Sequence, residues 1–450
     1  MSKNTLVSGT PRIGWMIDGD ENTPEIAVML ERTDESIQLT IPNKGMFDHN
    51  DPYGRWFSSG VEYSDDPDRT RFRYEPPSSL LFNDHLGPVS LIGCRQEAAS
   101  FGSNGAGFGR VVADYAVLGG RSWINFEKVN GVRTEMPGLA EWTGISSRKS
   151  EVKNDKARRA LEYIITMRSP APQSLARNKN LTLQPTWRSS NLSPGTVATH
   201  DVIQLETTAK RSESWDGLLA PHRAVQDLLS LSAWKQFGFS RIEVGVHDSR
   251  IRQKVSETGE DVGKAWSEVV THRLRLADDE SAHAKFLFTY SDIGAIGVRR
   301  WIRLRSKYER ALLPLIGIVD ERGLFVETRV AQTGIAIEAL GFQLANDERN
   351  GFKLNARGQI SYSDAMDAIL ADMSVVPIPD IEKWKSRSRL SYMGVKHADN
   401  PTPGIVTLAN AYRENALVLR YWIAGRLGCA ASTLTDRRRN DPLASEWIAE

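Results

Sequence analysis

Short runs of β-branched and aromatic residues recur through the first part of the chain, and clusters of Gly, Pro, Asn and Asp separate them. This pattern is typical of strands joined by surface loops. The expected strands are Glu25–Leu30, Ile37–Ile41, Val89–Cys94, Arg110–Leu118, Ser122–Phe126, Tyr163–Met167 and Val202–Glu206. Two longer polar stretches, Asp48–Pro77 and Ser169–Thr199, are predicted to be loops. We therefore expect this part to form antiparallel sheet.

The pattern changes at Pro221, where apolar residues begin to recur at helical spacing. Pro221–Trp234 is predicted to be a helix with its proline in the first turn. Two further strands, Arg241–His247 and Ala284–Tyr290, are expected before the helical pattern becomes continuous. The later helices are expected at Val298–Val319, Leu324–Leu344, Ser361–Met373, Asp380–Gly394 and Gly404–Leu427. Helical segments joined by short connections predict a bundle.

These patterns predict an α+β protein. Its 450 residues exceed the usual size of a single hydrophobic core, so more than one domain is expected. We predict a β-rich N-terminal domain over residues 1–294, with a possible break into two subdomains near residue 215. An all-α bundle is predicted over residues 295–450.

Charge and cysteine content narrow the classes of protein. The chain carries 57 Lys and Arg against 56 Asp and Glu, so only a local basic patch can attract nucleic acid. The two cysteines, Cys94 and Cys429, exclude a disulfide-rich scaffold. No apolar run reaches the ~18 residues of a membrane span, and no signal peptide is recognisable at the start. A cytoplasmic protein that does not bind membranes is therefore expected.

Common catalytic motifs are missing from the sequence. It contains no G-x-x-x-x-G-K-[ST] phosphate loop, no G-x-S-x-G nucleophile turn and no H-E-x-x-H zinc motif. None of the eight histidines stands near another histidine or a cysteine at the spacing of metal ligands. Neither a metal nor a cofactor is therefore expected.

One segment, residues 383–397 with the sequence KWKSRSRLSYMGVKH, concentrates positive charge beside a histidine. Its chemically notable side chains are Lys383, Lys385, Arg387, Arg389, Tyr392, Lys396 and His397. Arg and Lys are the usual ligands of phosphate, and histidine titrates near neutral pH. Cleavage of RNA through its 2′-hydroxyl needs a proton acceptor, a proton donor and a cation near the phosphorus. A solvated basic helix with a capping histidine is the plainer interpretation of the same residues.

Several short stretches, spread over most of the chain, carry a family resemblance. They are residues 91–93 (LIG), 115–119 (YAVLG), 131–142 (GVRTEMPGLAEW), 231–234 (LSAW), 300–301 (RW), 308–314 (YERALLP), 324–332 (LFVETRVAQ), 337–340 (IEAL) and 394–399 (GVKHAD). Together they resemble bacterial proteins that combine an ApeA-type N-terminal domain with a C-terminal Apea-like HEPN domain.

The resemblance implies a specific function. HEPN domains are small helical bundles that commonly dimerise, and their nuclease branch cleaves RNA without a metal. ApeA-type proteins look like anti-phage defence effectors that damage RNA and arrest the infected cell, which is abortive infection. Their N-terminal domain is thought to sense or regulate. RNA, a second copy bound through the bundle and a possible phage-derived trigger are therefore the partners that the resemblance implies.

The sequence departs from the family motif at one point. HEPN nucleases place an Arg before a His with four to six residues between them, and two such motifs meet across the dimer. Counted back from His397, the arginine would fall at residues 390–392, which are Leu390, Ser391 and Tyr392. The nearest arginine is Arg389, and its offset of eight residues corresponds to a rotation of about 80° on a helix.

Under this resemblance His397 would be the general acid and base, and Arg389 and Lys396 would hold the scissile phosphate. The residues expected to contact RNA beside them are Lys383, Lys385, Arg387 and Tyr392. Asp399 or Asn400 would orient the imidazole, as carboxylates and amides do elsewhere. Glu327 and Gln332 are expected to form the opposite wall.

Two alternatives remain open at this point. One is a degenerate HEPN domain that binds RNA, a nucleotide or a protein without cutting. The other is an unrelated structural or interaction protein.

Overall fold

The computed structural model of this protein describes most of the chain. The described residues are 3–20, 23–43, 51–101, 107–120, 125–193, 195–246, 252–254, 261–277, 283–321, 323–346, 354 and 357–448. They form two compact units, each built from separate stretches of the chain. The first unit comprises residues 1–135, 206–219 and 239–277, and the second comprises residues 136–205, 220–238 and 278–450. This division groups residues by contact in space, so the boundary at residue 294 and the break near 215 stay predictions.

The first unit is built on an antiparallel sheet. Its strands are β1 (Arg12–Ile17), β2 (Ile26–Arg32), β3 (Ile37–Asn43), β4 (Ser79–Asn83), β5 (Val89–Ile92), β6 (Arg95–Phe101), β7 (Gly107–Ala113), β8 (Tyr115–Leu118), β9 (Val129–Glu135), β15 (Arg241–Gly245) and β18 (Ser267–Thr271). They lie in the order β9-β15-β18-β8-β5-β4-β1-β2-β3-β7-β6. A short pair, β16 (Arg252–Lys254) and β17 (Asp261–Lys264), forms a sheet of its own. The β-rich N-terminal part is therefore confirmed.

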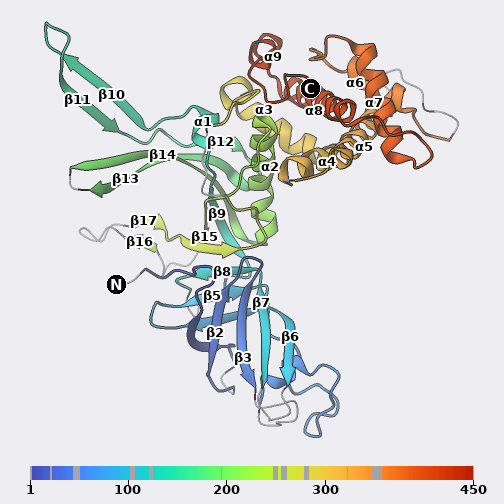
Figure 1. The fold of residues 1–450 in the computed structure, drawn as a ribbon. Coiled ribbons are helices and arrows are strands. Elements are labelled where there is room, and N and C mark those ends of the chain that lie inside the picture. The colour runs from blue at the N-terminus through green and yellow to red at the C-terminus, as the bar shows by residue number, and fades with distance from the viewer. Residues whose placement is uncertain are drawn as a thin grey trace. The chain divides into compact units, whose positions relative to one another are not determined.

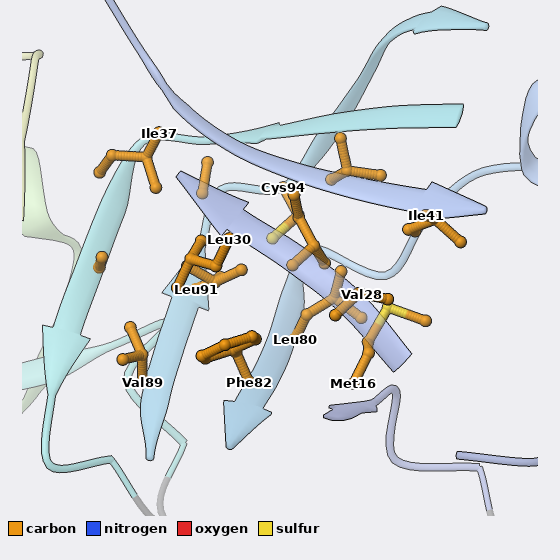
Figure 2. Packing of buried hydrophobic residues seen from close by; sticks show 14 of the residues in the cluster. Met16, Val28, Leu30, Ile37, Ile41, Leu80, Phe82, Val89, Leu91 and Cys94 are labelled. Carbon is orange, nitrogen blue, oxygen red and sulfur yellow. The ribbon is translucent and has the colours of Figure 1, made fainter. Parts of the chain in front are cut away.

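The core of this unit follows from the alternation of side chains along its strands. Successive residues of a strand point to opposite faces, so every second residue reaches the core. On β3, Ile37, Leu39 and Ile41 are fully buried. Figure 2 shows side chains of β1 to β5, among them Phe82 and Leu91, gathered in one apolar cluster.

The structure corrects the strand expected at Arg110–Leu118. The chain bends at Asp114, so that β7 pairs with β3 while β8 pairs with β5 and β18. The carboxylate of Asp114 accepts hydrogen bonds from Arg95 at 2.6 Å and from Arg273 at 3.1 Å, which holds the bend. The expected strand at Ser122–Phe126 lies largely outside the described residues.

The β-strands of the second unit correct a loop prediction. Ser169–Thr199 was expected to be a loop, but it contains β12 (Gln173–Ala176) and β13 (Leu181–Ser193), which pair with each other. Leu181 and Leu183 are fully buried, and this burial outweighs the polar composition of the stretch. A further strand, β14 (Thr196–Glu213), runs on into the first unit. The pair β10 (Arg148–Asn154) and β11 (Ala160–Met167) forms a separate arm (Figure 1).

The helices follow the expected order with different ends. They are α1 (Leu139–Thr143), α2 (Trp215–Ala233), α3 (Tyr290–Lys307), α4 (Glu309–Asp320), α5 (Val326–Ala345), α6 (Tyr362–Ala371), α7 (Ile381–Lys396), α8 (Ile405–Leu427) and α9 (Ala431–Arg438). A helical region, α3 to α9, thus follows the β-rich part, as predicted. Helices α4, α5, α7 and α8 pack beside one another (Figure 1).

Three local predictions in this region are wrong. Helix α2 begins six residues before Pro221, because Trp215 and Leu218 are buried and anchor its first turn. The single helix expected at Val298–Val319 is divided at Tyr308, whose buried ring meets that of Trp422 edge to face at 5.2 Å. The strand expected at Ala284–Tyr290 is absent, since these residues lead directly into α3.

Helix α8 lies at the centre of the helical region and is buried on nearly every side. It therefore carries buried charge as well as apolar residues. The guanidinium of Arg420 donates to the carbonyls of Leu231 at 2.7 Å and Ser232 at 3.0 Å, and to Asp441 at 2.8 Å. One buried cation thus joins α2, α8 and the C-terminal segment. Among the described residues, no helix is both long enough and apolar enough to span a bilayer.

Candidate functional site

Helix α7 carries most of the basic segment and is capped at both ends. The side chain of Asp380 accepts a hydrogen bond from the backbone N–H of Lys383 at 3.0 Å, which satisfies a donor of the first turn. At the other end His397 is the C-cap, and its backbone N–H donates to Met393 at 3.1 Å. The local sequence therefore places the candidate histidine where the helix stops.

The buried side of α7 orients the helix. Trp384 is fully buried and donates from Nε1 to Oδ1 of Asn415 on α8 at 2.9 Å. Ser388 lies one turn later, within 2.9 Å of the hydroxyl of Tyr362 on α6. These two contacts determine which side chains of α7 face solvent.

Arg387 points to this buried side and pairs with a carboxylate. Its Nη1 lies 2.9 Å from Oε1 of Glu414 on α8, and both side chains are largely buried. Burial raises the pKa of Glu414, while the charges of Arg387 and Arg413 oppose that shift. Arg387 can therefore reach RNA only after this buried pair separates.

Lys385 and Lys396 also have carboxylate partners, but at the edge of the helix. Lys385 lies 2.8 Å from Asp367 on α6, and this hydrogen bond raises the pKa of the lysine. Lys396 lies 3.2 Å from Oε2 of Glu338 on α5, and both members of that pair are about two-fifths exposed. Exposed ion pairs contribute at most about 1 kcal/mol, so a phosphate group can replace Glu338.

Tyr392 occupies one of the three positions where the HEPN motif would place its arginine, and its side chain is buried. Its hydroxyl donates to the same Oε2 of Glu338 at 2.8 Å. Burial, followed by this hydrogen bond, raises the pKa of Tyr392, so the hydroxyl stays protonated at neutral pH. Of the other two motif positions, Ser391 is buried and Leu390 is exposed. None of the three presents a cation.

Lys383, Arg389 and His397 form the remainder of the candidate site. All three side chains are exposed, and none makes a hydrogen bond or an ion pair with another side chain in the described structure. Asp399 is exposed as well, and Asn400 donates its amide to the carbonyl of Met393 at 3.2 Å. Neither residue is hydrogen-bonded to the imidazole in the described part of the chain.

Sequence reasoning overlooked the acidic partners. Glu327 and Gln332 were expected opposite the site, whereas the described hydrogen bonds from Tyr392 and Lys396 to α5 go to Glu338. Glu338 and Glu414 are single carboxylates within largely apolar stretches of helix, a pattern that indicates a buried or half-buried partner. Within the described residues, no group of three or more His, Cys, Asp or Glu side chains could hold a metal ion.

Comparisons with known proteins add one relationship. The sequence matches the family described as ApeA N-terminal domain 1 over residues 11–301, which is more than half of the chain. No C-terminal HEPN domain is detected by the same comparison. Searches of curated proteins and of solved structures found no match. This protein therefore belongs to the ApeA N-terminal domain 1 family, and that membership implies a role in anti-phage defence.

Proposed function

We propose that the protein is an anti-phage effector whose helical region is a HEPN-type ribonuclease that needs no metal. The observation that carries the proposal is the exposed imidazole of His397 at the end of α7, the helix that also presents the exposed Arg389. The family match supports the defence role, and the order of helices is compatible with a HEPN bundle.

In the proposed reaction His397 removes the proton from a ribose 2′-hydroxyl. The 2′-oxygen then bonds to the adjacent phosphorus, and the bond from phosphorus to the 5′-oxygen breaks. The leaving 5′-oxygen receives a proton from the imidazolium of His397. The products carry a cyclic phosphate and a free 5′-hydroxyl. Arg389 stabilises the negative charge that develops on the phosphate oxygens.

The remaining cations have graded roles in the proposal. Lys383 contacts the RNA backbone directly, and Lys396 does so after leaving its exposed pair with Glu338. Lys385 and Arg387 would first have to leave Asp367 and Glu414. The pair of Arg387 is buried and therefore expensive to break.

A second copy of the chain completes the proposed site. Arg389 and His397 are eight residues apart, so one helix presents them at some distance along its axis, at about 1.5 Å per residue. A two-fold dimer places the arginine of one copy near the histidine of the other, and it creates two equivalent sites.

The decisive test is cleavage of RNA by the full-length protein in the presence of EDTA. We expect the wild type to cleave, and we expect His397→Ala and Arg389→Ala each to lose at least about 100-fold of that rate. Arg303→Gln, an exposed change on α3, is the control and should keep full activity. A His397→Ala variant as active as the wild type would contradict the proposed role.

Mixing the two inactive variants tests the shared site. A mixed dimer of Arg389→Ala and His397→Ala subunits retains one site with both side chains if arginine and histidine come from different copies. We therefore expect partial recovery of cleavage after mixing. No recovery, despite subunit exchange shown by mass spectrometry, would assign both residues to one subunit.

A second candidate function is RNA binding without cleavage. The observation in its favour is Tyr392, which is buried where the motif would place an arginine. This candidate predicts intact RNA together with a gel shift that Lys383→Ala and Arg389→Ala weaken.

The N-terminal region is proposed to sense a phage-derived trigger. Cleavage or binding that rises only when lysate from infected cells is added to the purified protein would support this part of the proposal. Constant activity with and without such lysate would oppose it.

A further inference from the structure

A hollow of about 410 Å³ lies beside the first turns of α5 and α8, and its described lining includes no residue of α7. Its walls include Leu324, which precedes α5, Val326 at the start of α5, and Ile405 and Val406 at the start of α8. Trp447 and Ile448 add two apolar side chains, and the other described lining residues are Arg329, Ala409 and Tyr412. The hollow is thus largely apolar.

Trp447 is held at this hollow by its backbone. The side chain of Asn410 on α8 accepts a hydrogen bond from the N–H of Trp447 at 2.9 Å and donates to its carbonyl at 2.8 Å. Asn410 is buried, so both bonds are shielded from water. The indole nevertheless remains 64% exposed. The fold therefore fixes an apolar wall that no described residue covers.

Arg329 supplies the charge of the hollow. Among the described residues that line the hollow, Arg329 is the one side chain that is charged at neutral pH. Its guanidinium lies 5.4 Å from the ring centre of Tyr412. No carboxylate pairs with it in the described structure, and its buried Nε has no hydrogen-bond partner there. Glu327 lies in the first turn of α5, but it is exposed and does not line the hollow.

The helix starts add to this positive potential. Phe325 and Gly404 are the N-caps of α5 and α8, and neither provides a side-chain cap. The first N–H groups of both helices therefore lack that partner, and helix starts carry partial positive charge. An anion with an apolar body is the ligand chemistry that matches the lining.

The size of the hollow decides between possible occupants. One turn of helix with its side chains fills roughly 400–600 Å³, so the hollow cannot enclose a partner helix. Its volume lies instead within the range of small-molecule sites. A second copy related by a two-fold axis would bring like charge toward Arg329, which disfavours self-association at this surface.

We propose that this hollow, a groove at the starts of α5 and α8, binds an aliphatic carboxylate of medium chain length. The carboxylate pairs with Arg329, and the hydrocarbon chain lies along Leu324, Val406 and Trp447. Arginine suits this task because its planar guanidinium can hold both carboxylate oxygens.

Titration calorimetry of the full-length protein tests the proposal with matched ligands. We expect decanoate to bind, and 1-decanol and decyltrimethylammonium to bind at least about tenfold more weakly because they cannot pair with arginine. From octanoate to decanoate to dodecanoate, each step should tighten binding by roughly tenfold, as expected for two more buried methylenes. Equal affinity for the three head groups would overturn the proposal.

Variants locate the site. Arg329→Gln should weaken decanoate binding by about tenfold or more, Arg329→Lys should weaken it less, and Ala409→Phe should fill the groove and abolish binding. Arg303→Gln is the matched control and should bind as the wild type does. Circular dichroism verifies that each variant is folded, and the head-group series on the wild type remains decisive if Ala409→Phe is not.

Two other outcomes would assign the groove to another occupant. Tighter binding of acetyl-leucyl-leucine than of decanoate would identify a peptide C-terminus as the ligand and overturn the proposal. Decanoate binding that disappears as the protein dimerises in sedimentation experiments would identify a second copy. Unchanged decanoate affinity in Arg329→Gln would place the ligand elsewhere.

Discussion

The two sides of α7 carry similar side chains, but one side is buried against other helices and the other side is exposed to solvent. On the buried side Trp384, Arg387 and Tyr392 each have a partner from another helix. On the exposed side Arg389 and His397 have none among the described residues. The comparison teaches that the number of cations in a segment does not measure its capacity to bind phosphate, because paired cations are already neutralised.

The largest expected effect comes from the buried side. Replacing Trp384 with Ala removes a fully buried ring and its hydrogen bond to Asn415, so we expect the free energy of unfolding to fall by about 3–5 kcal/mol. Urea denaturation measures the loss. Leu390→Ala, on the exposed side, should cost less than about 0.5 kcal/mol. Similar losses in both variants would show that the two sides are not distinct.

The buried ion pair should give the next effect. Glu414→Ala removes the nearest carboxylate of Arg387 and Arg413 and leaves them the half-exposed Glu446, at 3.9 and 3.5 Å. We expect a loss of about 3 kcal/mol, because a buried charge without a close partner is costly. The double variant Arg387→Met with Glu414→Leu should recover part of that stability. A double variant less stable than Glu414→Ala would mean that the pair stabilises the bundle beyond avoiding an unpaired charge.

A buried histidine adds a dependence of stability on pH to the comparison. His222 on α2 is fully buried, and burial lowers its pKa to about 3 from the ordinary 6.5. Below pH 6.5 His222 binds a proton in the unfolded chain, whereas in the folded chain it stays neutral until about pH 3. The free energy of unfolding should therefore decrease as the pH falls through this window, by up to about 1.4 kcal/mol per pH unit.

The replacement His222→Gln isolates this contribution. Urea denaturation at pH 7.5 and at pH 5.5 gives the decrease in the free energy of unfolding on acidification. This decrease should be about 1 kcal/mol smaller in the variant than in the wild type. Equal losses in the two proteins would mean that His222 accepts a proton while folded.

The smallest expected change in stability belongs to the exposed side. Arg389→Ala and His397→Ala should each alter the free energy of unfolding by less than about 0.5 kcal/mol, because both side chains are exposed and neither has a side-chain partner among the described residues. Both should nevertheless impair the proposed action on RNA. Large destabilisation in either variant would show that the side chain supports the fold, and its effect on RNA would then be indirect.

Much of the fold could be predicted from periodicity. The spacing of apolar residues located β3, α5 and α8 to within a few residues, because strands and helices repeat their apolar positions at different periods. The errors occur where a distant contact outweighs local preference. The ring of Tyr308 packs against Trp422 and divides a predicted helix, and buried leucines turn the predicted loop at Ser169–Thr199 into strand.

The sequence predicted the helix that carries the candidate residues but not the partners of their side chains. Helix α7 spans Ile381–Lys396 with His397 as its C-cap, close to the helix expected at Asp380–Gly394. Its acidic partners Asp367, Glu338 and Glu414 come from three other helices, and no local pattern assigns a carboxylate to a particular cation.

The order of sheet and helices, the basic segment and the family could all be recognised in the amino-acid sequence alone. Only the tertiary structure decided which cations remain available. Arg387 and Arg389 are two residues apart, so a helix turns them about 200° from each other. Once Trp384 is buried against α8, one arginine meets Glu414 in the interior while the other is left in water. Rotation about a helix axis becomes a difference in chemistry only when neighbouring helices bury one side.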